Sequence, residues 1–186
     1  MIHRHLNLMF YIDTNRINAQ SKLPWINILE QWDRSDIIML GISKTAQQEA
    51  IAGSSRLRKE KAYSLIASHS LANTLDEKYL LQKIEKIIFP MGANNKNEKN
   101  DVAIVFTASK YFRILITDDG DSKNQPRGIL GCADDLRNIL GIQVMRDYQA
   151  VDLVNKEIIE RDKHASNWSK LIGIPLPDWI GKDNIY

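Results

Sequence analysis

The chain has 186 residues, of which 44% are hydrophobic and 26% charged, an ordinary composition for a globular domain with a sizeable core. The net charge of +2 excludes nucleic-acid binding through bulk charge, so such a role needs a local basic patch. The single cysteine, Cys132, excludes an internal disulfide and a zinc site built from cysteines, and it fits a reducing compartment such as the cytoplasm. We expect no signal peptide and no membrane partner, because no segment approaches the roughly 18 uninterrupted apolar residues of a membrane span.

The first part of the chain predicts two strands, each followed by a helix. The apolar run at 8–13 is typical of a strand buried on both faces, as in a parallel sheet. Pro24 can begin the helix that follows it. A second apolar run at 36–43 predicts a strand ending at Ser43, whose hydroxyl can cap a helix over the next ten residues. A further helix, or a helix broken by a loop, is expected within 54–75.

The second part predicts two more strands between further helices. The pattern indicates, in chain order, a helix over 76–89, a loop over 91–100, a helix over 101–112, a strand over 113–117, a loop over 120–128, a helix over 132–141 and a strand over 142–151. Pro90 ends the first of these helices and Gly141 the last. The helix that begins at Asp101 and reaches Phe112 is apolar almost all round, so we expect it to be deeply packed.

Strands that alternate with helices predict βαβ units and a mostly parallel sheet. The expected fold class is therefore α/β, with three layers in which helices cover both faces of the sheet. We expect one domain over residues 1–151 and a C-terminal extension, first helical and then irregular, over residues 152–186.

Acidic residues fall where this fold would bring distant segments together, since sites in open parallel sheets form outside the carboxyl ends of the strands. Four segments supply them: Asp13 ends the first strand, Glu49 lies on the second turn of the next helix, Asp101 begins the apolar helix, and Asp118, Asp119 and Asp121 follow the 113–117 strand. Carboxylates without cysteine or suitably spaced histidine select hard cations, Mg²⁺ or Mn²⁺. Such ions relieve the repulsion among the acids, activate water and support in-line attack on a phosphate.

At these residues the sequence resembles the PIN-domain nucleases. The segments that carry the resemblance are MFYIDTN, ISKTAQQEA, NDVAIVFTA and ILITDDGD, and the likeness covers roughly residues 8–150. The family pattern is an Asp after the first strand, a helix Glu, an Asp that opens a later helix, and Thr-x-Asp after the fourth strand. By resemblance, the catalytic, metal-binding acids are Asp13, Glu49, Asp101 and Asp119, Asp121 is an additional metal-binding acid, and Asn15 and Thr117 are orienting neighbours.

The resemblance also implies an activity and partners. The expected activity is divalent-metal-dependent hydrolysis of phosphodiester bonds, with RNA as the expected substrate and single-stranded RNA as one form that it can take. Many small members act as toxins of toxin–antitoxin pairs, which implies an antitoxin protein and a homodimer. The Thr-x-Asp spacing favours Asp119 over Asp118 at the metals. The family's third strand, expected near residue 88, has no counterpart in the sequence pattern.

Basic residues near this edge are candidates for binding the nucleic-acid backbone. The only cluster is Arg56, Arg58, Lys59 and Lys61, and Arg16 and Lys44 lie close in sequence to the proposed edge. The cluster is equally well explained as a solvated helix face.

Other interpretations stay open. Taken alone, the acids at 118–121 fit an ordinary turn, Asp101 fits a helix N-cap, and Glu49 fits a solvent-facing helix position. At the level of the whole chain, the alternatives are a catalytically inactive PIN-like scaffold or binding protein and a metal-dependent phosphatase.

Overall fold

A parallel sheet in the order β3-β2-β1-β4-β5 lies at the centre of the computed structural model, which describes residues 3–69, 71–111, 113–121 and 127–185. Within these residues the strands are β1 (Met9–Ile12), β2 (Met39–Ser43), β3 (Ile66–Ser68), β4 (Ile114–Ile116) and β5 (Val144–Met145). Every pair of neighbouring strands is parallel, which confirms the expected α/β class. Phe112 and residues 122–126 of the expected 120–128 loop lie outside the described residues.

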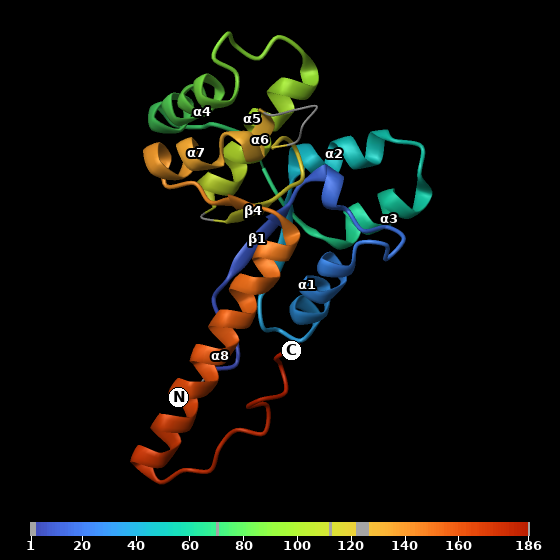
Figure 1. Ribbon diagram of the computed structural model, residues 1–186. Helices are drawn as coiled ribbons and strands as arrows, with labels where there is room; N and C mark the ends of the chain where they lie inside the picture. Colours follow the sequence, from blue (N-terminus) through green and yellow to red (C-terminus); the bar gives the residue numbers. More distant parts are fainter. Residues whose placement is uncertain (1–2, 70, 112, 122–126, 186) are drawn as a thin grey trace.

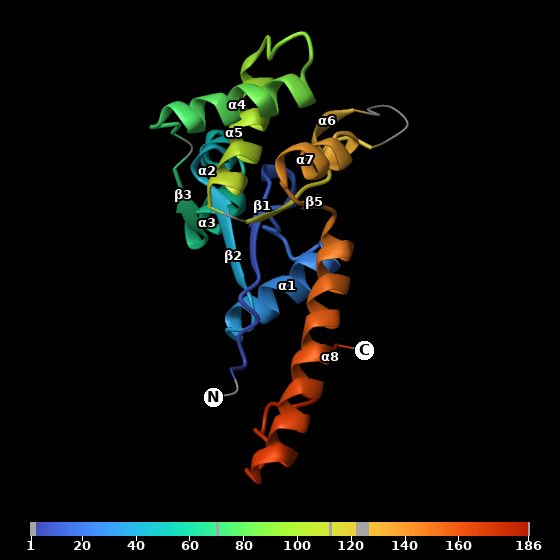
Figure 2. The same cartoon turned by 90° about the vertical axis from the view of Figure 1, so that its left-hand side faces the viewer.

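Helices cover both faces of the sheet (Figures 1 and 2). They are the short 3-10 helix η1 (Thr14–Arg16), α1 (Pro24–Arg34), α2 (Lys44–Ala52), α3 (Arg56–Ser64), α4 (Leu75–Ile88), α5 (Lys96–Lys110), α6 (Gly128–Gly131), α7 (Ala133–Leu140) and α8 (Asp147–Ile172). The helices α1 and α8 pack together on one face, while α5 covers the other with α4 packed against it. The three-layer arrangement is therefore confirmed. No helix in the described part of the chain is long and apolar enough to span a membrane.

The two central strands place the candidate site. The side chains of Phe10, Ile12, Leu115 and Ile116 are fully buried, as expected for strands covered on both faces. Ile12 is paired with Ile116 in the parallel register of β1 and β4. The next residues along each strand therefore emerge side by side at the carboxyl edge of the sheet.

The structure corrects two predictions around α5. The helix begins at Lys96, so residues 96–100 are not part of a loop and Asp101 lies on the second turn instead of at the N-terminus. Asn95 caps the helix, because its side chain accepts a hydrogen bond from the Glu98 N–H at 3.0 Å. The third strand is β3, not a segment near residue 88, which is the end of α4. It was missed because it is only three residues long and lies at a partly exposed sheet edge.

The strand predicted over 142–151 is also wrong for most of its length. Only β5 is extended there, and α8 begins at Asp147. Its buried residues Ala150, Val151, Val154 and Ile158 follow helical spacing. The helix continues across the expected boundary at residue 151 and ends at Gly173, whose φ of 70° is the left-handed conformation typical of a helix stop.

The segment after α8 folds back along the molecule and is fastened at Asp183 (Figure 1). The buried Asp183 carboxylate pairs with Arg4 at 2.5 Å and with Arg161 of α8 at 3.0 Å. The Asp183 carbonyl accepts a hydrogen bond from the indole N–H of Trp32 in α1 at 2.9 Å. The tail therefore connects the start of the chain to α1 and α8.

Candidate active site

Asp13 is the most deeply placed of the candidate acids. It follows β1 directly, its backbone N–H donates to the Ile116 carbonyl at 2.9 Å, and it is only 5% exposed. One carboxylate oxygen accepts the Thr14 N–H at 2.5 Å. The other accepts the Thr117 hydroxyl at 2.6 Å and the Asn15 amide at 3.0 Å. Both expected neighbours, Asn15 and Thr117, therefore contact Asp13 and fix its orientation.

The environment of Asp13 disfavours its charged form. Burial raises the pKa of Asp13 to about 6, although the hydrogen bonds from Thr117 and Thr14 act in the opposite direction. The negative charges of Glu49 and Asp119 add to the increase. These two carboxylates, from other parts of the chain, therefore lie within electrostatic reach of Asp13.

Glu49 comes to the same edge on α2. Ser43 caps this helix as predicted, with its hydroxyl accepting the Ala46 N–H at 3.0 Å. One Glu49 carboxylate oxygen accepts the Thr14 hydroxyl and the other accepts the Asn100 amide, each at 2.6 Å. Glu49 therefore links η1, α2 and α5. No local sequence pattern indicates the roles of Thr14 and Asn100, because each is an ordinary polar residue near a turn or a helix start.

Asp101 projects from the second turn of α5 toward the other acids. Burial, together with nearby negative charge, raises the pKa of the Asp101 carboxyl to about 8. Most of that charge belongs to Asp119, Asp13 and Glu49, in decreasing order of effect. The structure therefore brings all four acids named from the sequence into one electrostatic group.

Asp119 completes this group and is held by the loop after β4. Its backbone N–H donates to the Thr117 hydroxyl at 3.1 Å, and its carboxylate accepts the Ile129 N–H of α6 at 2.9 Å. The next residue, Gly120, has a φ of 89°, and a Cβ atom there would lie 1.9 Å from the Arg127 carbonyl oxygen. Only glycine allows the backbone at residue 120 to lie this close to the Arg127 carbonyl, and this contact places α6 beside Asp119.

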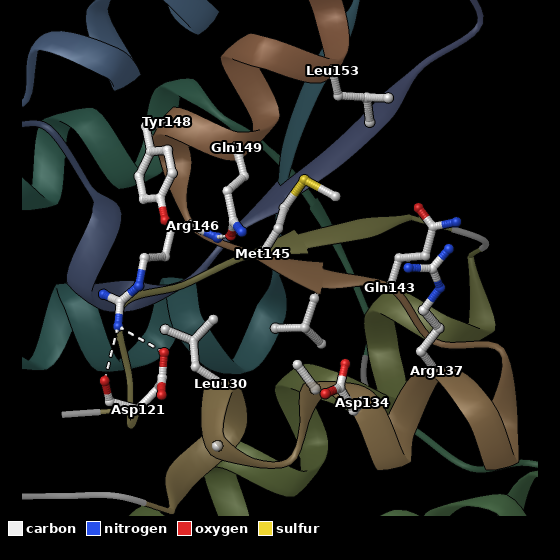
Figure 3. Close-up of a pocket in the computed structure, with 13 residues that line it drawn as sticks. Asp121, Leu130, Asp134, Arg137, Gln143, Met145, Arg146, Tyr148, Gln149 and Leu153 are labelled. Carbon is white, nitrogen blue, oxygen red and sulfur yellow. Dashed lines mark hydrogen bonds and ion pairs between the residues drawn. The ribbon is translucent and has the colours of Figure 1, made fainter.

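The other two acids of this loop point elsewhere. Asp118 is paired with Arg16 at 3.2 Å and, through its other oxygen, with Arg146. The carboxylate of Asp121 is exposed and lies 3.5 Å from the Arg146 guanidinium (Figure 3). The structure thus separates Asp119 from its neighbour Asp118, and it does not bring Asp121 into the group of four.

The basic residues named from the sequence are mostly engaged with protein groups. Three of them form ion pairs: Arg16 with Asp118 and Asp147, Lys61 with Glu30, and Arg56 with Glu60. Two others donate hydrogen bonds to uncharged groups: Arg58 to the Thr14 carbonyl at 2.5 Å, and Lys44 to the Gln47 side chain. For Lys59, no side-chain partner is found within the described residues. The hydrogen bond from Arg58 fixes the turn that carries Thr14, and Thr14 in turn contacts Glu49, so Arg58 stabilises the site indirectly.

Two further basic residues, which no sequence motif singles out, lie near the acids. A cavity of about 570 Å³ is lined by Asp101 and Asp119, and also by Lys96 and Arg127. Both are isolated in the sequence, with no neighbouring cluster to single them out. They place positive charge on the flank of a strongly acidic site.

The donor set suits a hard divalent cation, since it consists of carboxylate oxygens whose mutual repulsion a cation would relieve. As they stand, however, no three Asp, Glu, His or Cys side chains among the described residues are arranged to hold an ion together. The hydrogen bonds explain this, because Glu49 is turned toward Thr14 and Asn100, and Asp119 toward α6. Ion binding at this site requires some of these carboxylates to exchange their hydrogen bonds for the cation.

No family model and no curated protein matches the sequence, but solved structures do match the fold. One is a chain of VapBC2 from Rickettsia felis, solved with a DNA fragment from its promoter, with 12% identity over 75% of this chain and 98% of the other, and a TM-score of 0.47. Another is a chain of VapBC-1 from nontypeable Haemophilus influenzae, with 18% identity over 76% and 99% of the two chains, and a TM-score of 0.46. Since identities this low concern architecture alone, activity is inferred from the residues of the site.

Proposed function

We propose that the chain is a PIN-domain nuclease that hydrolyses phosphodiester bonds of RNA with the help of Mg²⁺ or Mn²⁺. The main support is the convergence of Asp13, Glu49, Asp101 and Asp119 from four separate segments. They are close enough for three of them to raise the pKa of the fourth. Burying several carboxylates close together costs free energy, and a bound cation would offset that cost.

In this proposal Asp13 and Asp101 would hold the ion, Asp119 would join them by releasing the Ile129 N–H, and Glu49 would join by releasing Asn100 or Thr14. When bound, Mg²⁺ or Mn²⁺ supplies positive charge that polarises the phosphate and favours deprotonation of the attacking water. Thr117 and Asn15 keep the Asp13 carboxylate aimed at the site through their hydrogen bonds.

Lys96 and Arg127 are proposed to receive the RNA backbone. They line the cavity that is also lined by Asp101, Asp119 and Glu98, so a phosphate there meets two positive charges beside the carboxylates. Of the predicted cluster on α3, Lys59 is the best candidate for a direct phosphate contact, because its neighbours Arg58 and Lys61 are engaged within the protein.

The decisive experiment compares two adjacent acids. Asp119→Asn should abolish Mn²⁺-dependent cleavage of single-stranded RNA, whereas Asp118→Asn should keep most of it, because Asp118 faces two arginines and not the other acids. Calorimetric titration with Mn²⁺ should show binding to the wild type and strongly weakened binding to Asp13→Asn. Full activity in the purified Asp119→Asn protein would exclude this site.

The same assays separate the alternatives. Hydrolysis of p-nitrophenyl phosphate without cleavage of RNA would favour a phosphatase. Absence of both activities, together with absence of Mn²⁺ binding, would favour an inactive PIN-like scaffold. Four clustered carboxylates argue against the scaffold, which has no need of them.

A toxin role, an antitoxin partner and a homodimer belong to the same proposal through the resemblance to PIN-domain toxins. Expression in a bacterial host should arrest growth, and Asp119→Asn should relieve the arrest. The molecular mass in solution tests the homodimer separately, since dimerisation does not require an active site.

A further inference from the structure

A second cavity, of about 650 Å³, lies beside the edge strand β5 (Figure 3). Its walls come from α6, α7, β5 and the start of α8. This volume lies within the range of roughly 300–1,000 Å³ typical of small-ligand sites. None of the four clustered acids lines it.

The helix α6 separates this cavity from the acid site. Gly128, at one end of α6, lines the cavity that contains Asp101 and Asp119, whereas Leu130 and Gly131, at the other end, line the cavity beside β5. The Leu130 N–H donates to the Asp119 carbonyl at 2.8 Å, so the dividing wall is attached to a catalytic candidate. Among the described residues, α6 is therefore the element that lies between an occupant of one cavity and an occupant of the other.

The lining combines the three kinds of group that a nucleotide requires with two carboxylates, those of Asp121 and Asp134. Arg137 and Arg146 offer positive charge, and the Gln143 side chain offers an amide donor and acceptor. Tyr148 is 43% exposed and presents an aromatic ring at the rim (Figure 3). Arg146 is held by Asp118 and Asp121, while for the exposed Arg137 side chain the described residues provide no ion pair.

We infer that the cavity beside β5 binds one nucleotide of a single-stranded RNA, adjacent to the phosphate held at the acids. Arg137 meets a phosphate, Tyr148 stacks on the base and Gln143 reads the edge of the base. The inference rests on the proposed nuclease function and adds to it a site that selects the substrate. A strand that crosses α6 reaches both cavities at once.

The test measures binding separately from cleavage. A fluorescent single-stranded RNA octamer is titrated, in Mg²⁺, with protein that carries Asp119→Asn so that the RNA stays intact. Adding Arg137→Gln or Tyr148→Ala should weaken binding about tenfold each, in line with the loss of one phosphate contact or one stacked base. Tyr148→Phe should retain the affinity, because it keeps the ring. Lys163→Gln, which removes an exposed charge from the far part of α8, should leave binding unchanged.

A second arm asks where on the strand the contact lies. Octamers that lack one base, at each position in turn, should lose affinity most at one position, and Tyr148→Ala should abolish the sensitivity at that position. Unchanged affinity of Arg137→Gln and Tyr148→Ala, or a loss at the abasic position that persists in Tyr148→Ala, would overturn the inference. If the octamer binds as expected but the wild type never cleaves it, the nuclease proposal fails while this site stands. If the wild type cleaves RNA and both variants bind normally, the nucleotide site fails alone.

Discussion

At the scale of single residues, the site is defined by carboxylates that the fold keeps from full ionisation. Burial and mutual repulsion raise the pKa of Asp101 to about 8 and that of Asp13 to about 6. Both values lie above the ordinary value for aspartate, so the native state without metal holds protons that the unfolded chain releases. At neutral pH the proton held by Asp101 therefore relieves part of the repulsion among the acids, and the repulsion becomes complete only above about pH 8.

This gives a prediction for the metal-free protein. An acid whose pKa is raised on folding favours the native state below its ordinary pKa, and this advantage is lost as the pH rises through the folded value. The free energy of unfolding should therefore fall between about pH 4 and pH 8, by on the order of 2 kcal/mol from Asp101 after screening by solvent. Urea denaturation at several pH values measures this, and Asp101→Asn should flatten the curve.

Added Mn²⁺ provides the control for that experiment. At pH 8 it should raise the melting temperature of the wild type, because the cation replaces the missing protons, and it should do so much less for Asp101→Asn. A wild-type stability that rises with pH over this range would contradict the assigned environment of Asp101.

At the scale of elements, the loop from β4 to α6 determines where Asp119 points. Its backbone turns sharply at Gly120, and two N–H groups of α6, those of Ile129 and Leu130, then donate hydrogen bonds to the carboxylate and the carbonyl of Asp119. The sequence shows the Thr-x-Asp-Gly pattern, but it does not show that the glycine lies against the Arg127 carbonyl.

Gly120→Ala tests this loop, and Gly92→Ala is its matched control. Both glycines have left-handed φ angles, of 89° and 87°, so both substitutions carry a conformational cost of about 1–2 kcal/mol. At Gly92 the nearest atom is 4.0 Å from an added Cβ, whereas at Gly120 the backbone obstructs it. Gly120→Ala should therefore cost clearly more in urea denaturation, and it should also impair RNA cleavage. Equal losses in the two variants would show that the close approach is not tight.

The elements that the sequence predicted well have strong local signals. Asp13 and Asp119 follow short apolar runs, and parallel strands must end at the same edge, so their convergence could be inferred. The position of Asp101 within its helix is harder to predict, because Asn95, Asn100 and Asp101 are all reasonable N-caps and only the structure shows that Asn95 is used.

Other features depend on contacts between distant parts of the chain. The bonds from Thr14 and Asn100 to Glu49 join residues 35 and 51 positions apart, and no local pattern announces them. The partly exposed β3 is too short to show a recognisable alternation of apolar and polar residues. The start of α8 has a sequence pattern that resembles a strand, so the helix was not predicted there.

At the scale of the whole molecule, the tail after α8 holds distant parts together through Asp183. Although burial alone raises its pKa, the hydrogen bonds and positive charges of Arg4 and Arg161 lower the pKa of Asp183 below its ordinary value. A lowered pKa means that this contribution to stability is present above the ordinary value and is lost as the pH falls below it.

Asp183→Asn should accordingly destabilise the protein by about 2 kcal/mol at pH 7, since it leaves the largely buried Arg161 side chain and the exposed Arg4 without their shared partner. The difference from the wild type should shrink as the pH is lowered below about 4. Asp178→Asn, an exposed acid on the same tail, is the control and should change little. A constant difference from pH 7 down to pH 3 would show that the ion pairs are not responsible.

The contact between Arg4 and Asp183 also has a practical consequence. It fastens the two ends of the polypeptide beyond the amino ends of the strands, on the side away from the acids. A tag, a fluorescent protein or a short peptide bridge that closes the chain into a ring would thus lie on the side of the sheet opposite the acids and leave the acid group accessible.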